Sequence, residues 1–384
     1  MTSMQPGEML QDAEEQVDLA PEERFTATRG YWHLVWRRFR RHRVATVSAV
    51  VLILIYAVAL LAEFVAPHGT ASRFEGYQNA PPQVISLVDT SDGFRIGLFG
   101  HGYAVEENEE TRRRTMTIDE SSVRELGLFV KGEEYELAGL IPWDRHLIGP
   151  VDSDEPVFLL GTDSLGRDLF SRIVHGTRVS MSIGLVGVAA SMILGIFFGG
   201  LSGYYGGATD TFIQRFIEFI MSIPSLPLWM VLAASIPTTW GPITSYFAIT
   251  LILSIIGWTD LARVVRGRFL ALREEDFVEA ARLDNARTLR IMRRHMLPSF
   301  SSHIIAALTL AIPGMILAET SLSFLGVGLQ APVVSWGVLL QEAQNVRSLV
   351  NTPWLMFPGV AVIVAVLALN FVGDGLRDAA DPYN

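Results

Sequence analysis

The chain has 384 residues, of which 50% are hydrophobic, and its mean hydropathy is +0.33. This composition is too apolar for an ordinary soluble domain and indicates an integral membrane protein. The formal net charge of −10 argues against general nucleic-acid binding. The absence of cysteine excludes disulfides, zinc–thiolate sites and iron–sulfur clusters ligated by this chain.

A nucleotide-binding phosphate loop is also excluded. The motif G-x-x-x-x-G-K-[ST] needs a lysine, and the single lysine of the chain, Lys131, is followed by Gly132. We therefore expect no cofactor in this chain. If ATP and magnesium power the protein, a partner chain must bind them.

Six apolar segments dominate the sequence. A bilayer core about 30 Å thick needs roughly 20 apolar helical residues to cross it. Segments of about that length lie at residues 44–65, 179–201, 212–236, 243–262, 303–324 and 354–372. The first is too long for the apolar core of a signal peptide, so we interpret it as a retained anchor. The sequence predicts an all-α integral membrane protein with about six transmembrane helices.

Arginine is concentrated beside two of these segments. One cluster precedes the first segment, and a second lies in the loop 263–298 between the fourth and fifth. Positively charged flanks stay in the cytoplasm, so six crossings place both termini there. The cytoplasmic N-terminal tail is predicted at 1–43, and its first 30 residues are acidic and look disordered.

Residues 68–156 form a long acidic stretch of the kind that is translocated. Strand-like runs occur at 84–88 and 94–99, and two more such runs flank Lys131–Gly132, which suggests a hairpin there. We predict a β-rich extracytoplasmic insert between the first two helices, with a partly ordered loop as the alternative. The core domain, with the other five helices, would be 157–384.

The loop 263–298 has the most informative pattern. Acidic residues at 274–276 favour the start of a short helix, and Asp284–Asn285 is a plausible turn because asparagine tolerates left-handed geometry. A second helix is expected to run to His295, with Pro298 ending it. Small exposed side chains would let another protein approach closely. A basic amphipathic helix lying on anionic lipid is the alternative.

Glu279-Ala280-Ala281, the turn position Asn285, Ile291 and Leu297-Pro298 resemble the EAA loop of bacterial ATP-driven importer permeases. In that family the loop docks as a coupling helix into a groove of the ATPase subunit. The turn position is usually glycine there, and asparagine can adopt the same backbone. The resemblance implies that contacts with the ATPase involve Glu279, Ala280, Ala281, Leu283, Asn285, Ile291, His295, Leu297 and Pro298.

Four further stretches resemble the peptide/nickel permease family, of the oligopeptide/dipeptide permease C type. They are WRRFRRHRVA at 36–45, GTDSLGRDLFSR at 161–172, ETSLSFLGVG at 319–328 and GDGLRDAADP at 373–382. The matches cover most of 31–67 and 158–384, in the topological order of the family. The insert is longer than most members carry, so the chain resembles the longer-loop members.

This resemblance implies a type I importer permease fold and a transport subunit that performs no bond chemistry. It implies a place in the bacterial cytoplasmic (inner) membrane, as half of a path for peptides or a related small solute. The implied partners are a second homologous permease, two cytoplasmic ATPase subunits and an extracytoplasmic substrate-binding protein, together with the lipid bilayer.

Two predicted helices contain candidates for lining the path. Met221, Ser222 and Met230 lie in the proline-containing third segment and Met315 in the fifth, and methionine offers an adaptable apolar surface. Generic packing of kinked helices is the alternative. Glu319 is an ionisable residue inside a membrane segment, so it could line the path, carry a proton or pair structurally.

No catalytic and no metal site is predicted. The eight histidines lack metal-ligand spacing, and neither H-E-x-x-H nor G-x-S-x-G occurs, which argues against a membrane enzyme. The main alternative function is an ion-coupled secondary transporter or channel that works without ATPases. It would require an ion site at mid-membrane and internal repeats with broken helices.

Overall fold

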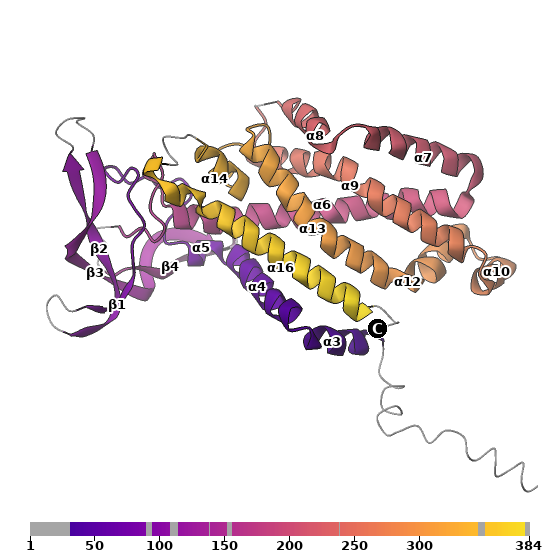
Figure 1. The fold of residues 1–384 in the computed structure, drawn as a ribbon, viewed down its shortest axis with the longest axis horizontal. Helices are drawn as coiled ribbons and strands as arrows, with labels where there is room; N and C mark the ends of the chain where they lie inside the picture. The colour runs from indigo at the N-terminus through magenta and orange to yellow at the C-terminus, as the bar shows by residue number, and fades with distance from the viewer. Residues whose placement is uncertain are drawn as a thin grey trace, which may run out of the picture.

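The structure is a computed structural model that describes residues 31–89, 94–107, 114–137, 139–151, 156–237, 239–344 and 350–380. Figure 1 shows an antiparallel sheet at one end of an elongated molecule and a bundle of long helices that extends from it. The short helix α10 (Asp276–Leu283) lies at the opposite end from the sheet. Residues 1–30, which include most of the predicted tail, lie outside the described residues.

Five helices within the described ranges are long and apolar enough to cross a membrane. α6 has 37 residues and is therefore about 55 Å long, so it extends well beyond an apolar core about 30 Å thick. Five of the six predicted segments are confirmed as helical. The five helices are α4 (Arg43–Leu60), α6 (Leu169–Tyr205), α9 (Pro242–Leu272), α13 (Ser301–Phe324) and α16 (Phe357–Ala380).

The third predicted segment is not one straight helix. α7 (Gly207–Ser222) and α8 (Ser225–Ala234) meet at 85°, and the break falls at Ile223 and Pro224. Proline lacks a backbone N–H and disfavours helical geometry in the residue before it, so the pair of residues interrupts the hydrogen-bond ladder. The number of spans is thus five, or six if the bent pair forms one span.

Small residues hold α6 directly against α9. A methyl group added to Gly203 would lie 2.6 Å from the backbone oxygen of Arg266, and one on Gly199 would collide with Ala262. A methyl group on Gly195 would lie 2.9 Å from the Cβ of Leu261, so the close packing of α6 through these glycines occurs within this chain. The main buried cluster also includes Met181, Leu253 and Ile316, which belong to α6, α9 and α13.

The sheet has four antiparallel strands in the order β1-β2-β3-β4. They are β1 (Ser86–Asp89), β2 (Arg95–Glu107), β3 (Arg114–Leu137) and β4 (Ile141–Pro150). The β-rich character of the predicted insert is confirmed, but the hairpin at Lys131–Gly132 is wrong. β3 pairs with β4 on both sides of that point, with a register shift between Lys131 and Tyr135. The chain reverses at Gly139 instead, whose φ of 70° favours glycine.

Polar contacts join the sheet to the end of the first helix. The carboxylate of Glu133 accepts hydrogen bonds from the Gly69 amide at 3.0 Å and the Ser72 hydroxyl at 2.8 Å, and contacts His68 Nδ1 at 3.3 Å. His146 of β4 is buried and hydrogen-bonds the backbone oxygen of Ala66 at 2.5 Å. These bonds position the sheet on the segment that follows α5 (Ala62–Val65).

The chain is helical before the first span. α3 (Tyr31–Arg41) buries Val35 and Phe39 against Ala45 and Ala379, which lie at the ends of α4 and α16. His42 separates α3 from α4 and caps α4 by accepting from the Ala45 amide at 3.1 Å. The last part of the predicted tail is thus a packed amphipathic helix.

Candidate functional site

The loop 263–298 forms the tip of the molecule opposite the sheet (Figure 1). α9 extends to Leu272, and after α10 the backbone of Asn285 adopts φ 55°. The left-handed backbone of this residue separates α10 from α11 (Thr288–Ile291), as the sequence predicts. A hydrogen bond from the Ala286 amide to the backbone oxygen of Ala281, at 3.1 Å, closes the turn.

The second helix of the loop does not end at Pro298. α11 continues into a π-helical turn at Met292–Met296 and then α12 (Leu297–Ser299), which has Pro298 in its first turn. A proline in the first turn of a helix is tolerated because the amide it lacks would have no partner within that helix. The break before α13 falls instead at Phe300, whose φ of −127° is not helical.

α10 has a buried face and an exposed face. Val278 and Ala281 pack into a cluster that includes Phe269 of α9, Ile291 of α11 and Phe300. Glu279, Ala280 and Leu283 are exposed, and the side chain of Leu283 is 88% exposed. Leu283 therefore presents an apolar side chain to the surroundings of the loop.

The nine residues predicted to contact the ATPase therefore divide into three groups by exposure. Ala281 and Ile291 are buried and hold the loop together, whereas His295 and Leu297 are half-buried. The exposed members are Glu279, Ala280, Leu283, Asn285 and Pro298. We call the face formed by Glu279, Ala280 and Leu283 the α10 face. These three side chains can contact another protein without unfolding of the loop.

A cavity of about 550 Å³ lies between α6, α9, α13 and the break between α7 and α8. Met221 and Met315, two of the candidates for lining the path, line this cavity. Ser222 and Met230 are not among its lining residues. The sequence interpretation missed Trp229 and Asp260, which do line it.

The cavity wall on α13 consists mainly of small residues, together with Leu308 and Met315. Ala307, Ala311, Gly314 and Ala318 recur at spacings of four, three and four, which place them on one face of the helix. This spacing is visible in the sequence and could have identified the lining face. The resulting wall is largely apolar, and Asp260 is the one ionisable residue among the lining residues described.

Glu319 does not line this cavity. Its side chain is fully buried, and Oε1 accepts hydrogen bonds from Ser323 at 2.8 Å and Ser335 at 2.7 Å. Ser335 is the N-cap of α14 (Trp336–Glu342) and accepts from the Val338 amide. Glu319 therefore joins α13 to the start of α14.

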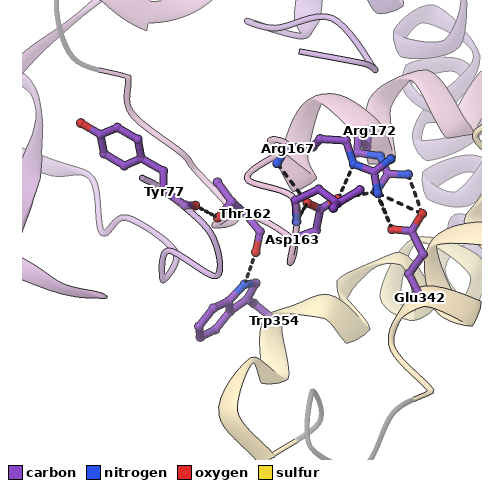
Figure 2. Close-up of polar contacts among 8 residues, drawn as sticks. Tyr77, Thr162, Asp163, Arg167, Arg172, Glu342 and Trp354 are labelled. Carbon is purple, nitrogen blue, oxygen red and sulfur yellow. Dashed lines mark hydrogen bonds and ion pairs between the residues drawn. The ribbon is translucent and has the colours of Figure 1, made fainter. Parts of the chain in front are cut away.

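The segment that precedes α6 forms an ionic cluster with the other end of α14. Asp163 accepts from Arg167 and from Arg172, each at 2.7 Å, and Arg172 also binds Glu342 at 2.6 and 2.8 Å (Figure 2). The Thr162 carbonyl accepts from the indole N–H of Trp354 at 3.0 Å. The motif at 161–172 thus fixes the start of α6 to α14.

The described residues contain no group of three or more histidine, aspartate or glutamate side chains that could hold a metal ion. The Arg215–Glu218 ion pair on α7, at 2.6 Å, is local and exposed. The α10 face and the apolar cavity are thus two places where this chain can contact other molecules.

Two family models match this chain. The family model described as "Binding-protein-dependent transport system inner membrane component" matches residues 192–383, which contain α7, α9, α10, α13 and α16. A second model, "N-terminal TM domain of oligopeptide transport permease C", matches residues 30–82. The two matches thus include the loop, the first span and the cavity-lining helices α9 and α13.

Individual relatives agree with these matches. The dipeptide transport system permease protein DppC of Bacillus subtilis is 37% identical over 58% of this chain and 68% of its own length. The oligopeptide transport system permease protein OppC of Haemophilus influenzae is 37% identical over 62% of this chain and 75% of its own length. A solved structure of the MetNI methionine ABC transporter aligns with 18% identity and a TM-score of 0.43, over 56% of this chain and 98% of that one.

The family model matches half of the chain, and the DppC and OppC relatives are similar over more than two thirds of their own lengths. The chain therefore belongs to the family of inner membrane components of binding-protein-dependent transport systems.

Proposed function

We propose that the chain is the permease subunit of an ATP-driven importer of peptides or a related small solute. The α10 face carries this proposal, because Glu279, Ala280 and Leu283 are exposed on a helix whose other side is fixed in the loop core. Family membership supports an importer, and the names of the DppC and OppC relatives support peptides as the solute.

The packing of the loop suggests how ATPase motion reaches the cavity. Val278 and Ala281 of α10 belong to one buried cluster with Leu261 and Phe269 of α9 and Ile304 of α13. α9 and α13 are two of the helices that line the cavity. A displacement of α10 by the ATPases, which would bind ATP and magnesium, would therefore move both cavity walls. Such a change needs different contacts with the α10 face in the two ATPase states.

A second permease would complete the path. Phe212, Phe216 and Phe219 of α7 recur at i, i+4 and i+7 and are 76, 51 and 64% exposed. This apolar stripe lies on the bent pair whose break borders the cavity. We propose that the partner permease packs near this stripe and provides the other half of the path.

The features at the two ends of the molecule support one orientation of the chain in the membrane. The α10 face and the arginine-rich loop lie at one end of the molecule, and the sheet lies at the other (Figure 1). Positively charged loops stay in the cytoplasm. We therefore propose that both termini and α10 are cytoplasmic, and that the sheet is extracytoplasmic, on the side where a substrate-binding protein delivers the solute.

Co-purification tests this function. The full chain would be isolated in mild detergent with its two ATPases, as wild type and as Glu279→Arg. Asp378→Arg is the matched control, because it makes the same charge change at an exposed carboxylate of α16. We expect wild type and the control to retain the ATPases, and Glu279→Arg to lose most of them.

An ion-coupled secondary transporter predicts the opposite result. Wild type would then be isolated alone, and uptake into vesicles would continue without ATP. The presence of both ATPases with ATP-dependent uptake would exclude that alternative.

A further inference from the structure

Four arginines line an open groove of about 540 Å³, one at the N-cap of α11 and three on α11 and the π-helical turn. Arg287, Arg290 and Arg294 recur at i, i+3 and i+7, which places them along one side of a helix, and Arg293 adjoins them. The other lining residues are Leu289 and Pro298, so no carboxylate borders the groove.

Three other arginines at this end of the molecule have partners. Arg263 pairs with Asp260 at 2.6 Å, and Arg266 pairs with Asp210 at 2.5 Å. Arg282 lies over the ring of Tyr204 at 5.3 Å. Within the described part of the chain, none of the four groove arginines has an ion-pair partner. Like charges gathered without a counter-charge repel one another, so the groove favours an anion.

Packing holds the arginines outward. Ile291 and Met296, on the other side of the same helical stretch, are 1 and 0% exposed and belong to the loop core. The arginines cannot turn inward without exposing those side chains. Leu289 is 71% exposed beside them, so the groove combines four positive charges with an apolar edge.

The groove lies close to the level at which a bilayer ends. The apolar window of α13 begins at His303, nine residues after Arg294. At 1.5 Å per helical residue this separation is at most roughly 13 Å, and an arginine side chain can span much of it. Phospholipid headgroups occupy this zone on either side of the apolar core.

We infer that this arginine groove binds the headgroup of an anionic phospholipid, and that a headgroup with two phosphates, as in cardiolipin, fits it best. Arginine forks bind phosphate oxygens in pairs, so four guanidinium groups can hold two phosphates. Leu289 and Pro298 then lie against the glycerol and the first acyl carbons. Basic pockets beside membrane helices bind such lipids through the same chemistry.

The neighbouring helices α10 and α11 then have different partners. The sequence leaves open whether the loop contacts protein or lipid. The small and apolar side chains of α10 suit a protein surface, whereas the α11 arginines suit phosphate. The lipid site does not depend on the ATPase contact, so each can fail without the other.

Lipid titration of the purified full chain tests the inference. The chain would be delipidated in detergent and titrated with cardiolipin or with phosphatidylcholine, with bound lipid counted by native mass spectrometry. Each arginine near a lipid surface contributes about 1 kcal/mol, so Arg290→Gln with Arg294→Gln should weaken cardiolipin binding roughly 25-fold. Arg37→Gln with Arg41→Gln is the control, because it removes two exposed charges of α3 at the same i, i+4 spacing.

Retention of cardiolipin by the control together with its loss in the groove variant supports the site. Equal loss in both variants would overturn it, since binding would then follow net charge alone. Equal binding of phosphatidylcholine, or complete displacement by 10-fold excess inorganic phosphate, would also overturn it. A groove variant that binds cardiolipin normally and loses only the ATPases would assign the arginines to the protein interface instead.

Discussion

The guanidinium group of Arg172 binds the carboxylate of Glu342 at 2.6 and 2.8 Å, although 170 residues separate them in the sequence. Arg172 is 1% exposed and also binds Asp163. Together with the Glu319–Ser335 bond, this pair holds α14 at both ends, between α6 and α13. Two walls of the cavity are thus braced by one short helix.

Replacing Arg172 by methionine should strongly destabilise the chain. The variant leaves Arg167 as the one described cation that contacts Asp163 and Glu342, and removal of one partner from a buried ionic cluster costs about 3 kcal/mol. The free energy of unfolding would be measured by denaturant titration in micelles. Arg215→Met is the control, because its exposed pair with Glu218 should contribute at most about 0.5 kcal/mol. Equal losses in the two variants would contradict the bracing role.

Glu319→Gln should leave uptake close to the wild-type rate. Glutamine retains an oxygen that can accept from Ser323 and Ser335, and the residue does not line the cavity. Glu319→Leu keeps a similar volume but removes the acceptor, so it should lower both stability and uptake. Uptake in membrane vesicles and thermal unfolding of the same preparations would be compared. Loss of uptake in Glu319→Gln with normal stability would instead support a protonation role.

The two faces of α10 should respond differently to substitution. Leu283→Ser changes an 88% exposed side chain, so stability should change by less than about 0.5 kcal/mol while ATPase binding falls. Val278→Ala removes buried methyl groups from the loop core and should cost about 2 kcal/mol. Unfolding and ATPase co-purification would be measured on both variants. Destabilisation by Leu283→Ser would show that the leucine supports the fold of the loop.

Local signals made much of this fold predictable. The apolar windows of α4, α9, α13 and α16 are long enough to identify from composition, and Asn285 marks the turn of the loop by its tolerance of left-handed geometry. The exposed and buried faces of α10 could not be separated in advance. Ala280 and Ala281 are chemically identical, and only the position of Phe269 and Ile291 decides which of them is buried.

The features that the sequence did not predict depend on contacts between residues far apart in the chain. Lys131–Gly132 has the composition of a hairpin turn, but pairing with β4 continues past it and keeps β3 as one strand. Pro224 predicts a kink, whereas the 85° angle depends on how α8 packs on α9. The contact between Arg172 and Glu342 requires α14 to fold back on α6. No local sequence pattern predicts that arrangement.

The junction between sheet and membrane domain should depend on pH through Glu133. The hydrogen bond from His68, together with those from Ser72 and Gly69, lowers the pKa of this carboxyl from 4.5 to about 2. A lowered pKa means that the stabilising contribution is complete above pH 4.5 and is lost as the pH falls towards 2. Thermal unfolding would be followed from pH 7 to pH 2.5.

The variant Glu133→Gln should be less stable than wild type at pH 7, and the difference should shrink below pH 4.5. Glu134→Gln makes the same charge change at an adjacent exposed position for which no hydrogen bond is seen, so it should match wild type across the range. A difference between wild type and Glu133→Gln that stays constant with pH would contradict the role of the ionised carboxylate.

Filling the cavity should stop transport without disturbing the loop. Met315 lies against the cavity and close to Gly257, where an added methyl group would lie 2.6 Å from the methionine Cε. Met315→Trp therefore cannot be relieved towards α9 and must project into the space that a solute would occupy. We expect uptake to fall at least about tenfold while ATPase co-purification is unchanged, since overpacking costs about 1–3 kcal/mol and α10 is remote from the site. Ile363→Trp, on the exposed side of α16, is the control for added volume and should transport normally. Normal uptake by Met315→Trp would mean that the solute passes elsewhere, and it would move the path to the surface near α7.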